Sequence, residues 1–363
     1  MPLLNEGQTI RDTYEVERFL GEGAFAEVYR VKHRFLGRQA MKVFKQTVDD
    51  AEEVVDMLGE AILLSRIGHP NIVRVFDANT IETEQGTRGY FTMEYVPGGT
   101  LDMFWQSFGE KHVQTETCVD IIKQVCRGLR VAHDANPPII HRDIKPQNIL
   151  VGYEAEGLRV RLSDFGLAKE LNPLSLLASA AGTLAFKPPE VFGHTRNDSR
   201  AADVFAVGVT MYLLLADELP FRVDPMLGWS QNTTEWEVPP PPSDWNLLVD
   251  SSLDQIVMKC IDFNPCCRYS SAGDLLAALD SWKATSKPLP QRAESSAGSK
   301  MALSGMPLDS ARGRQLFAEA EGLAKLGLLA DAADRMEEAF NYVPEFREKY
   351  AYRVSLWRRG ITM

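Results

Sequence analysis

Short segments of alternating apolar and polar residues dominate the first part of the chain. Tyr14–Leu20 and Val28–His33 alternate in this way on either side of Gly21–Glu27, a pattern that predicts a β-hairpin with a glycine-rich turn. Gln39–Phe44 and Tyr90–Val96 are short and mostly apolar, and we expect both to be strands. The amino-terminal part is therefore predicted to be rich in β-structure.

Helical periodicity takes over further along. A helical stretch is expected at Asp49–Ile67, and a longer one at Thr115–His133. The apolar residues of the second recur at near-helical spacing: Ile121, Ile122, Val125, Leu129 and Ala132. The apolar run Val204–Ala216 is bounded by Asp203 and Asp217 and is well short of the ~20 residues that a membrane helix needs. It predicts a buried core helix and no membrane span.

Composition narrows the classes of protein. The chain has 363 residues with ordinary hydrophobic (45%) and charged (25%) contents, and a formal net charge of −11. An acidic balance argues against general binding to nucleic acid or to an anionic membrane surface. The number of cysteines, five, is odd, and no Cys-x-x-Cys pair suggests a zinc site. Reduced thiols and the lack of a signal-peptide pattern at the amino terminus predict a cytoplasmic location.

One ten-residue string carries the chemistry. His141–Leu150 reads His-Arg-Asp-Ile-Lys-Pro-Gln-Asn-Ile-Leu, and Asp164-Phe165-Gly166 begins fourteen residues after it. Two acids, a lysine and an amide between apolar residues are costly to bury without a purpose. The two strings at this spacing resemble the catalytic loop and the magnesium loop of eukaryotic-type Ser/Thr protein kinases, in a plain form similar to the bacterial enzymes.

The resemblance implies a reaction and its participants. Asp143 would accept the proton of a substrate hydroxyl, and Lys145 would neutralise the transferring phosphoryl group of ATP. Asn148 and Asp164 would hold two Mg²⁺ ions, which prefer oxygen ligands. The lysine two residues after Asp143, together with Thr183, is typical of Ser/Thr rather than Tyr kinases.

A nucleotide site is implied in the β-rich part. Two glycines let the backbone approach phosphates closely, although Gly-x-Gly alone is equally compatible with an ordinary turn, and Ala26 stands where a third glycine is usual. Lys42 matches the lysine that holds the α- and β-phosphates, and Glu60, nine residues before His69-Pro70-Asn71-Ile72-Val73, matches its acidic partner. The phosphate loop would consist of Leu20, Gly21, Glu22, Gly23, Ala24 and Phe25. The adenine pocket would consist of Leu20, Val28, Ala40, Leu150, the gatekeeper Met93 and the hinge residues Glu94 and Val96.

The resemblance also predicts structural and regulatory features. Lys187-Pro188-Pro189-Glu190 takes the place of the family's Ala-Pro-Glu and departs from it at the first position. Glu190 is expected to pair with Arg268, and Asp203 to anchor the backbone of the catalytic loop. Arg142 indicates control by phosphorylation of the activation segment, with two candidate acceptors, Ser175 and Ser179.

These assignments predict an α+β, bilobal kinase domain at residues 14–283, with an N-lobe at 14–96 and a C-lobe at 97–283. Residues 284–308 are rich in Ser, Pro, Lys, Gly and Ala and predict a flexible linker. In 309–363, small and apolar residues fall where a tetratricopeptide repeat has its consensus, with a turn at Gly327, although a generic helical hairpin fits as well. One such repeat cannot bury its own apolar face, so it should dock on the kinase, dimerise or bind a protein partner.

Two functions remain open on the sequence. The first is an active Ser/Thr protein kinase that uses ATP and Mg²⁺ to modify protein substrates. The second is a scaffold in which a catalytically weak kinase fold carries a working helical tail. The presence of the expected residue at each catalytic position favours the enzyme.

Overall fold

The computed structural model describes residues 2–108, 112–165, 184–192, 199–221, 237–284 and 310–361. The chain divides into two compact units. The described part of the first unit comprises the residues up to Tyr95 together with Asp164 and Phe165. The second unit runs from Val96 to Ser163 and, among the described residues, resumes at Leu184. The predicted linker beyond Ala284 and the residues Ser175, Ser179 and Thr183 lie outside the described residues.

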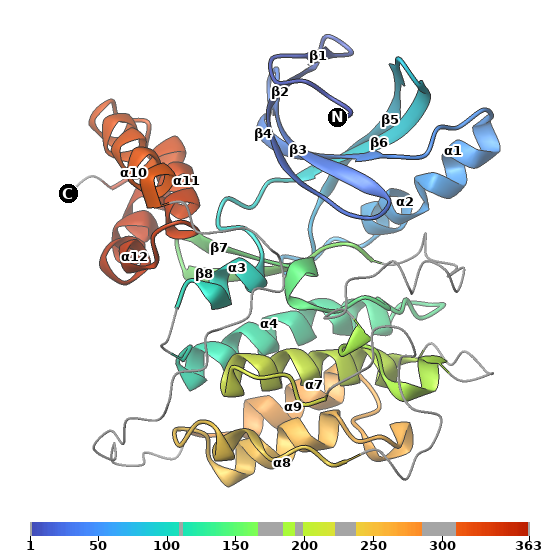
Figure 1. Ribbon diagram of the computed structural model, residues 1–363, viewed down its shortest axis with the longest axis vertical. Coiled ribbons are helices and arrows are strands. Elements are labelled where there is room, and N and C mark those ends of the chain that lie inside the picture. The colour runs from blue at the N-terminus through green and yellow to red at the C-terminus, as the bar shows by residue number, and fades with distance from the viewer. Residues whose placement is uncertain are drawn as a thin grey trace. The chain divides into compact units, whose positions relative to one another are not determined.

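The first unit contains an antiparallel sheet of six strands in the order β1-β2-β3-β4-β6-β5 (Figure 1). The predicted hairpin is confirmed by β2 and β3, which pair directly. The strands are β1 (Thr9–Ile10), β2 (Tyr14–Glu22), β3 (Ala26–His33), β4 (Gly37–Phe44), β5 (Val75–Thr83) and β6 (Gly86–Glu94).

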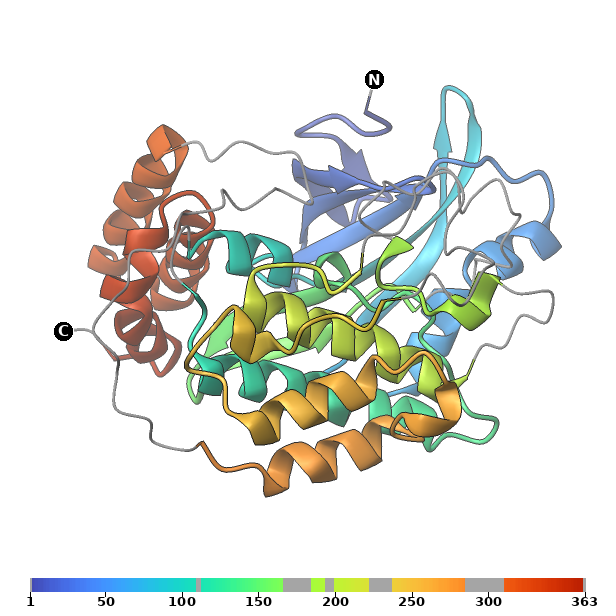
Figure 2. The same ribbon diagram turned by 60° about the horizontal axis from the view of Figure 1, so that its bottom comes forward.

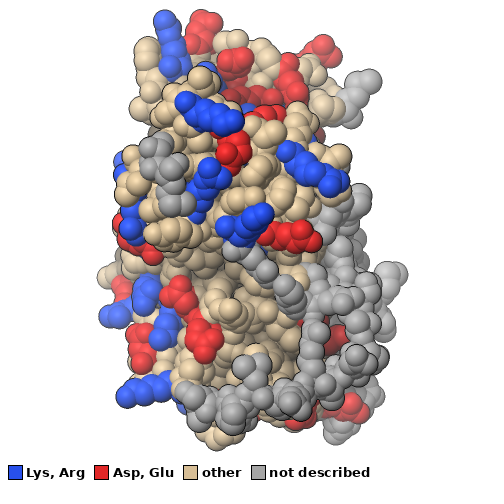
Figure 3. Space-filling model, turned by 90° about the vertical axis from the view of Figure 1, so that its left-hand side faces the viewer, with Lys and Arg blue, Asp and Glu red and all other residues tan. Residues whose placement is uncertain are grey.

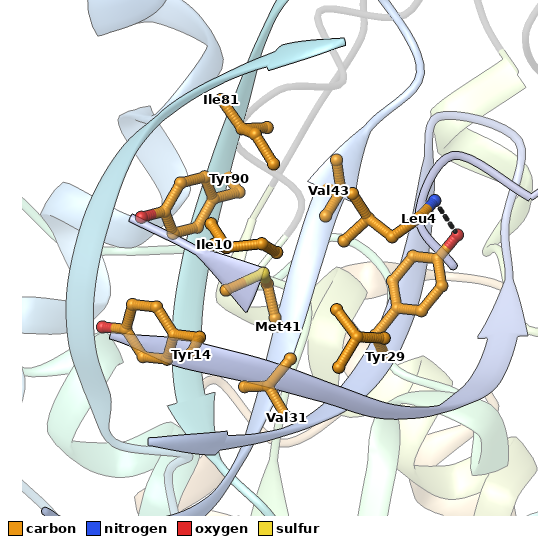
Figure 4. Close-up of a cluster of buried hydrophobic side chains, with 10 residues drawn as sticks. Leu4, Ile10, Tyr14, Tyr29, Val31, Met41, Val43, Ile81 and Tyr90 are labelled. Atoms are coloured by element: carbon orange, nitrogen blue, oxygen red, sulfur yellow. Dashed lines mark hydrogen bonds between the residues drawn. The ribbon is translucent and has the colours of Figure 1, made fainter. Parts of the chain in front are cut away.

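The two faces of this sheet have different roles because side chains alternate along each strand. One face carries a buried apolar cluster that includes Met41 and Val43 of β4 and Tyr29 of β3 (Figure 4). The amino-terminal segment contributes to this cluster through Leu4, whose N–H donates to the Tyr29 hydroxyl at 3.0 Å. Lys42, which alternates with Met41 and Val43, belongs to the opposite face.

The helical segment of the first unit differs from the prediction. Instead of one helix over Asp49–Ile67, the structure has α1 (Ala51–Met57) and α2 (Gly59–Arg66). The interruption at Leu58 has a local reason, since the glycine that follows is among the poorest residues for a helix interior. The break leaves Glu60 in the first turn of α2, where it is buried.

The second unit is largely helical (Figures 1 and 2). The predicted helix is α4 (Thr115–His133), and the apolar run forms α7 (Arg200–Ala216), which is buried along nearly its whole length, as predicted. A two-stranded ribbon joins β7 (Ile149–Glu154) to β8 (Gly157–Leu162). Among the described residues, the other α-helices of this part are α3 (Leu101–Gln106), α8 (Ser251–Cys260) and α9 (Ala272–Ser281). Across the described ranges, no helix has the length and apolar character needed to span a bilayer.

The carboxy-terminal part of the second unit consists of α10 (Ser310–Lys325), α11 (Leu329–Phe340) and α12 (Pro344–Arg358). Gly327, with a φ of +76°, lies in the turn between the first two, where the sequence predicts one. Their shared core consists of small and large apolar residues: Ala320, Ala332, Ala333, Met336, Phe340, Val354 and Trp357. On the side of the molecule shown in Figure 3, acidic and basic side chains are interspersed.

These helices contact the β7–β8 ribbon and α3 of the same unit. Tyr153 of β7 packs against their core, and its ring meets Phe340 edge-on at 5.8 Å between centroids. The buried Glu337 carboxylate accepts the Tyr153 N–H at 3.1 Å and an Arg358 N–H at 2.8 Å. The buried Arg347 guanidinium donates to the Phe104 carbonyl at 3.1 Å and lies 4.3 Å from the centroid of the Phe104 ring.

Candidate active site

A buried lysine joins two acids in the first unit. The Lys42 ammonium donates to Glu60 Oε2 at 2.9 Å and to Asp164 Oδ1 at 2.7 Å, and we call these residues the Lys42 triad. Burial alone would lower the pKa of Lys42, but the carboxylates of Asp164 and Glu60 outweigh this effect and hold the pKa above its usual value. The ammonium therefore stays charged. The side chain of Asp164 is 40% exposed and remains accessible.

The predicted nucleotide residues of the first unit lie on one face of the sheet. Val28 is opposite Lys42 in the ladder between β3 and β4, and Ala40 is opposite Met93 between β4 and β6. Because side chains two residues apart share a face, Val28, Ala40 and Met93 lie on the same side as Lys42. Leu20 immediately precedes Gly21, the ladder partner of Val28. Glu94 ends β6 next to Met93.

The glycine-rich turn closes between β2 and β3. The Gly23 N–H donates to the Ala26 carbonyl at 2.8 Å, and Glu22 pairs with Lys45 at 2.8 Å. Ala24 and Phe25 form the bend, with Phe25 49% exposed. A Cβ atom would meet nothing within 4 Å at Gly21 and only the Ala26 carbonyl oxygen, at 3.9 Å, at Gly23, and neither glycine has a positive φ. The fold itself does not demand glycine there, so the space is compatible with a ligand.

The catalytic loop belongs to the second unit and is held from α7. The Asp203 carboxylate accepts the backbone N–H groups of His141 at 2.8 Å and Arg142 at 2.9 Å, which confirms the predicted anchor. Its Oδ2 also lies 3.0 Å from His133 Nε2. Arg142 has a φ of +67°, a left-handed conformation that is uncommon for a residue with a side chain.

Around Asp143, the loop gathers its polar side chains. Asp143 Oδ2 accepts from Asn148 Nδ2 at 2.9 Å and lies 3.1 Å from Lys145 Nζ. Asn148 Nδ2 also donates to the Asp143 carbonyl at 2.7 Å, so the amide oxygen is the atom of Asn148 suited to a metal ion. Leu150 follows at the start of β7 and is half-buried, and Val96 is buried.

One contact was not anticipated. Lys187 Nζ lies 3.2 Å from Asp143 Oδ1 and donates to the Arg142 carbonyl at 2.7 Å. In the sequence, Lys187 differs from the family's Ala-Pro-Glu pattern, and no role was predicted for it. The one local indication that Lys187 could be buried is its position between Phe186 and Pro188. We call Asp143, Lys145, Asn148 and Lys187 the Asp143 cluster.

The segment that carries Lys187 is itself anchored. Glu190 Oε1 and Oε2 accept from the Arg268 guanidinium at 2.7 and 2.9 Å, which confirms the predicted ion pair. Arg268 is buried and also donates to the Asp262 carbonyl at 2.6 Å. This fork-like pair fixes the end of the activation segment.

The side chains present suit a magnesium nucleotide. Asp164 offers a carboxylate in the first unit, and Asn148 offers an amide oxygen in the second. Both are hard oxygen donors, and Mg²⁺ in nucleotide sites takes few protein ligands besides phosphate and water. Lys42 supplies a permanent positive charge for phosphate oxygens. Each unit therefore carries an oxygen donor of the kind that Mg²⁺ prefers, and the first unit also carries a cation that suits a phosphate.

The fold and these side chains define a class of protein. Residues 14–279 match the family of the protein kinase domain, and the chain belongs to this family and has its fold. It is 32% identical over 282 residues to a probable serine/threonine-protein kinase of Clostridium perfringens, covering 76% of this chain and 39% of that protein. It is also 32% identical over 278 residues to the serine/threonine-protein kinase PknB of Mycolicibacterium smegmatis, covering 75% of this chain and 43% of that protein.

The chain thus spans about two fifths of the length of these curated relatives. Among solved structures, the kinase domain of PknI from Mycobacterium tuberculosis is similar, with a TM-score of 0.56 at 25% identity. The similarity covers 76% of this chain and 98% of that one.

Proposed function

We propose that this protein is an active Ser/Thr protein kinase that phosphorylates protein substrates. The observation that carries the proposal is the Lys42 triad, in which a buried, charged lysine is held between the two acids that the family's chemistry requires. The kinase names of the relatives support the same activity. The complete triad favours the enzyme over a catalytically weak scaffold.

Bound ATP–Mg²⁺ would supply the γ-phosphoryl group. Lys42 would hold the α- and β-phosphates, while Asp164 and Asn148 would contribute oxygen ligands for the metal ions. Asp143 would accept the proton of the substrate hydroxyl, and Lys145, 3.1 Å from Asp143, would neutralise charge on the transferring group. The family's loop over the phosphates is proposed at Gly21–Phe25, where the glycines leave space.

Transfer of labelled phosphate tests this proposal. The full chain is incubated with radiolabelled ATP and Mg²⁺, alone and with a generic basic protein, and the products are hydrolysed for phosphoamino-acid analysis. Label on serine or threonine is expected. Label on tyrosine alone, or no label in either protein, would contradict the proposal.

Regulation by autophosphorylation is a further part of the proposal. Arg142 is positioned by Asp203 beside the catalytic aspartate, where a phosphate on the activation segment could pair with it. The candidate acceptors are Ser175 and Ser179. Intact-mass and peptide analysis after incubation with ATP–Mg²⁺ should find one of them modified, and modification at neither would remove this part.

For the carboxy-terminal helices we propose docking on the kinase domain's own helical lobe. This choice among the three open possibilities is supported by the buried contacts of Glu337 and Arg347 with Tyr153 and Phe104. We also propose that these helices are a tetratricopeptide-like segment, on the basis of the consensus positions in the sequence. A cytoplasmic setting is proposed as well, in keeping with five free cysteines.

A further inference from the structure

The Asp143 carboxylate is bound from two separate parts of the chain. Its Oδ2 atom meets Asn148 and Lys145, both within the catalytic loop, at 2.9 and 3.1 Å. Its Oδ1 atom meets Lys187, which lies 44 residues further along, at 3.2 Å. The loop contacts come with the local chain path, whereas the Lys187 contact depends on how the later segment folds back.

The same ammonium also fixes the backbone. Lys187 Nζ donates to the Arg142 carbonyl at 2.7 Å, while the Arg142 N–H donates to Asp203 at 2.9 Å. Both polar backbone groups of Arg142, a residue with a φ of +67°, are therefore held by side chains from elsewhere in the unit. Such a conformation costs about 1–3 kcal/mol and persists where the surroundings over-determine it. Lys187 is one of the groups that do so.

The contact between Lys187 and Asp143 is buried, so its loss would remove a partner from charged groups inside the protein. The Lys187 side chain is 9% exposed and that of Asp143 is 4% exposed. A buried ammonium is costly unless it is paired and hydrogen-bonded, and here it has a carboxylate and a carbonyl. Three residues later, Glu190 ties the segment to Arg268, so the backbone that carries Lys187 is also fixed.

We propose that Lys187 is a positioning residue for phosphoryl transfer, which orients the Asp143 carboxylate through Oδ1 and locks the catalytic loop to the segment that precedes Glu190. The inference rests on the proposed kinase function. A general base must be placed within a fraction of an ångström of its productive position, and a misplacement of ~1 Å can cost ~100-fold in rate. Loss of the Lys187 side chain would remove the contact at Asp143 Oδ1 and the hydrogen bond to the Arg142 carbonyl.

The test is steady-state kinetics of the full chain with Lys187→Met, Lys187→Arg and a matched control, Lys123→Met. Lys123 lies on α4 and pairs with Asp280 at 3.2 Å rather than with a member of the Asp143 cluster. Lys187→Met should lower kcat about tenfold, the value of one charge-assisted hydrogen bond. The KM for ATP should change by less than about twofold because the Lys42 triad is untouched.

Lys187→Arg, which keeps the charge and the donors, should retain more of kcat than Lys187→Met, and Lys123→Met should match wild type. A kcat of Lys187→Met at or above the wild-type value would overturn the inference. So would equal losses in the Met and Arg variants accompanied by a fall in melting temperature, since these would indicate a purely structural role. A wild-type protein that transfers no phosphate would instead refute the proposed function, so the two failures are distinguishable.

Discussion

The Lys42 triad and the Asp143 cluster are built from the same kinds of side chain in opposite proportions. The triad has one ammonium between two carboxylates, a formal charge of +1 − 2 = −1. The Asp143 cluster has one carboxylate between two ammonium groups, a formal charge of +2 − 1 = +1. A surplus carboxylate suits Mg²⁺, and a surplus ammonium suits the oxygens of a phosphoryl group. The two clusters, each within its own unit, therefore differ in the sign of their net charge.

We expect the largest effect on activity from removing the Lys42 ammonium, the only cation of the Lys42 triad. Lys42→Met leaves two carboxylates without the ammonium that neutralises them and removes the contact proposed for the phosphates. We expect kcat/KM for ATP to fall by about 10²–10³-fold, the range found when one preorganised electrostatic group is lost. Lys32→Met, at an exposed position of the neighbouring strand β3, is the matched control and should stay near wild type. Equal activity in the two variants would separate the triad from catalysis.

In the carboxy-terminal helices, a buried charge is expected to contribute to the stability of the fold. Arg347→Ala removes a buried guanidinium that binds the Phe104 carbonyl and stacks on its ring, so the free energy of unfolding should fall by about 2–3 kcal/mol. Lys349→Ala, exposed on the same helix, should change it by less than about 0.5 kcal/mol. Thermal unfolding and limited proteolysis of the two variants provide the measurement. If both behave alike, the docking of α12 is not held by Arg347.

A smaller effect concerns pH. Burial raises the pKa of Glu337 to about 7, against the opposing influence of Arg358. The folded state therefore binds this proton more tightly than the unfolded chain, in which the pKa is near its ordinary value of 4.5. The contribution of Glu337 is present below pH 4.5 and is lost as the pH rises towards 7.

Glu337→Gln should remove that pH dependence while keeping the polar side chain. Arg358 retains a carboxylate partner in Asp334, at 2.6 Å, so the variant leaves no unpaired cation. Melting temperatures measured across this pH range should decline less steeply in the variant than in wild type. Parallel curves would show that Glu337 does not titrate in the folded protein between these values.

The resemblance to protein kinases located most of the candidate site residues because these residues lie in short, ordered strings. Asp143, Lys145 and Asn148 are close in the chain, so their meeting needs only the local path of one loop. Lys42 and Glu60 are further apart, but the strand and helix that carry them were predicted from periodicity. The break between α1 and α2 was missed because helical periodicity continues across Leu58 and Gly59.

What escaped prediction depends on tertiary packing. Nothing local indicates that Lys187 meets Asp143, since the contact requires the chain to return after 44 residues. Arg347 is one of several basic residues of α12, and its burial follows only from the position of Phe104 on α3. From the sequence alone, the carboxy-terminal helices could therefore dock on the kinase domain, dimerise or bind a protein partner.

The most direct test of the account is the kcat of Asp143→Asn beside wild type at saturating ATP–Mg²⁺. The amide has nearly the shape of the carboxylate but cannot serve as the base. We expect a loss of phosphate transfer of about 10²–10⁴-fold with the melting temperature preserved. Transfer by Asp143→Asn at the wild-type rate would contradict the role of Asp143 as the base, because the reaction would then proceed without the carboxylate that Lys145 and Lys187 contact.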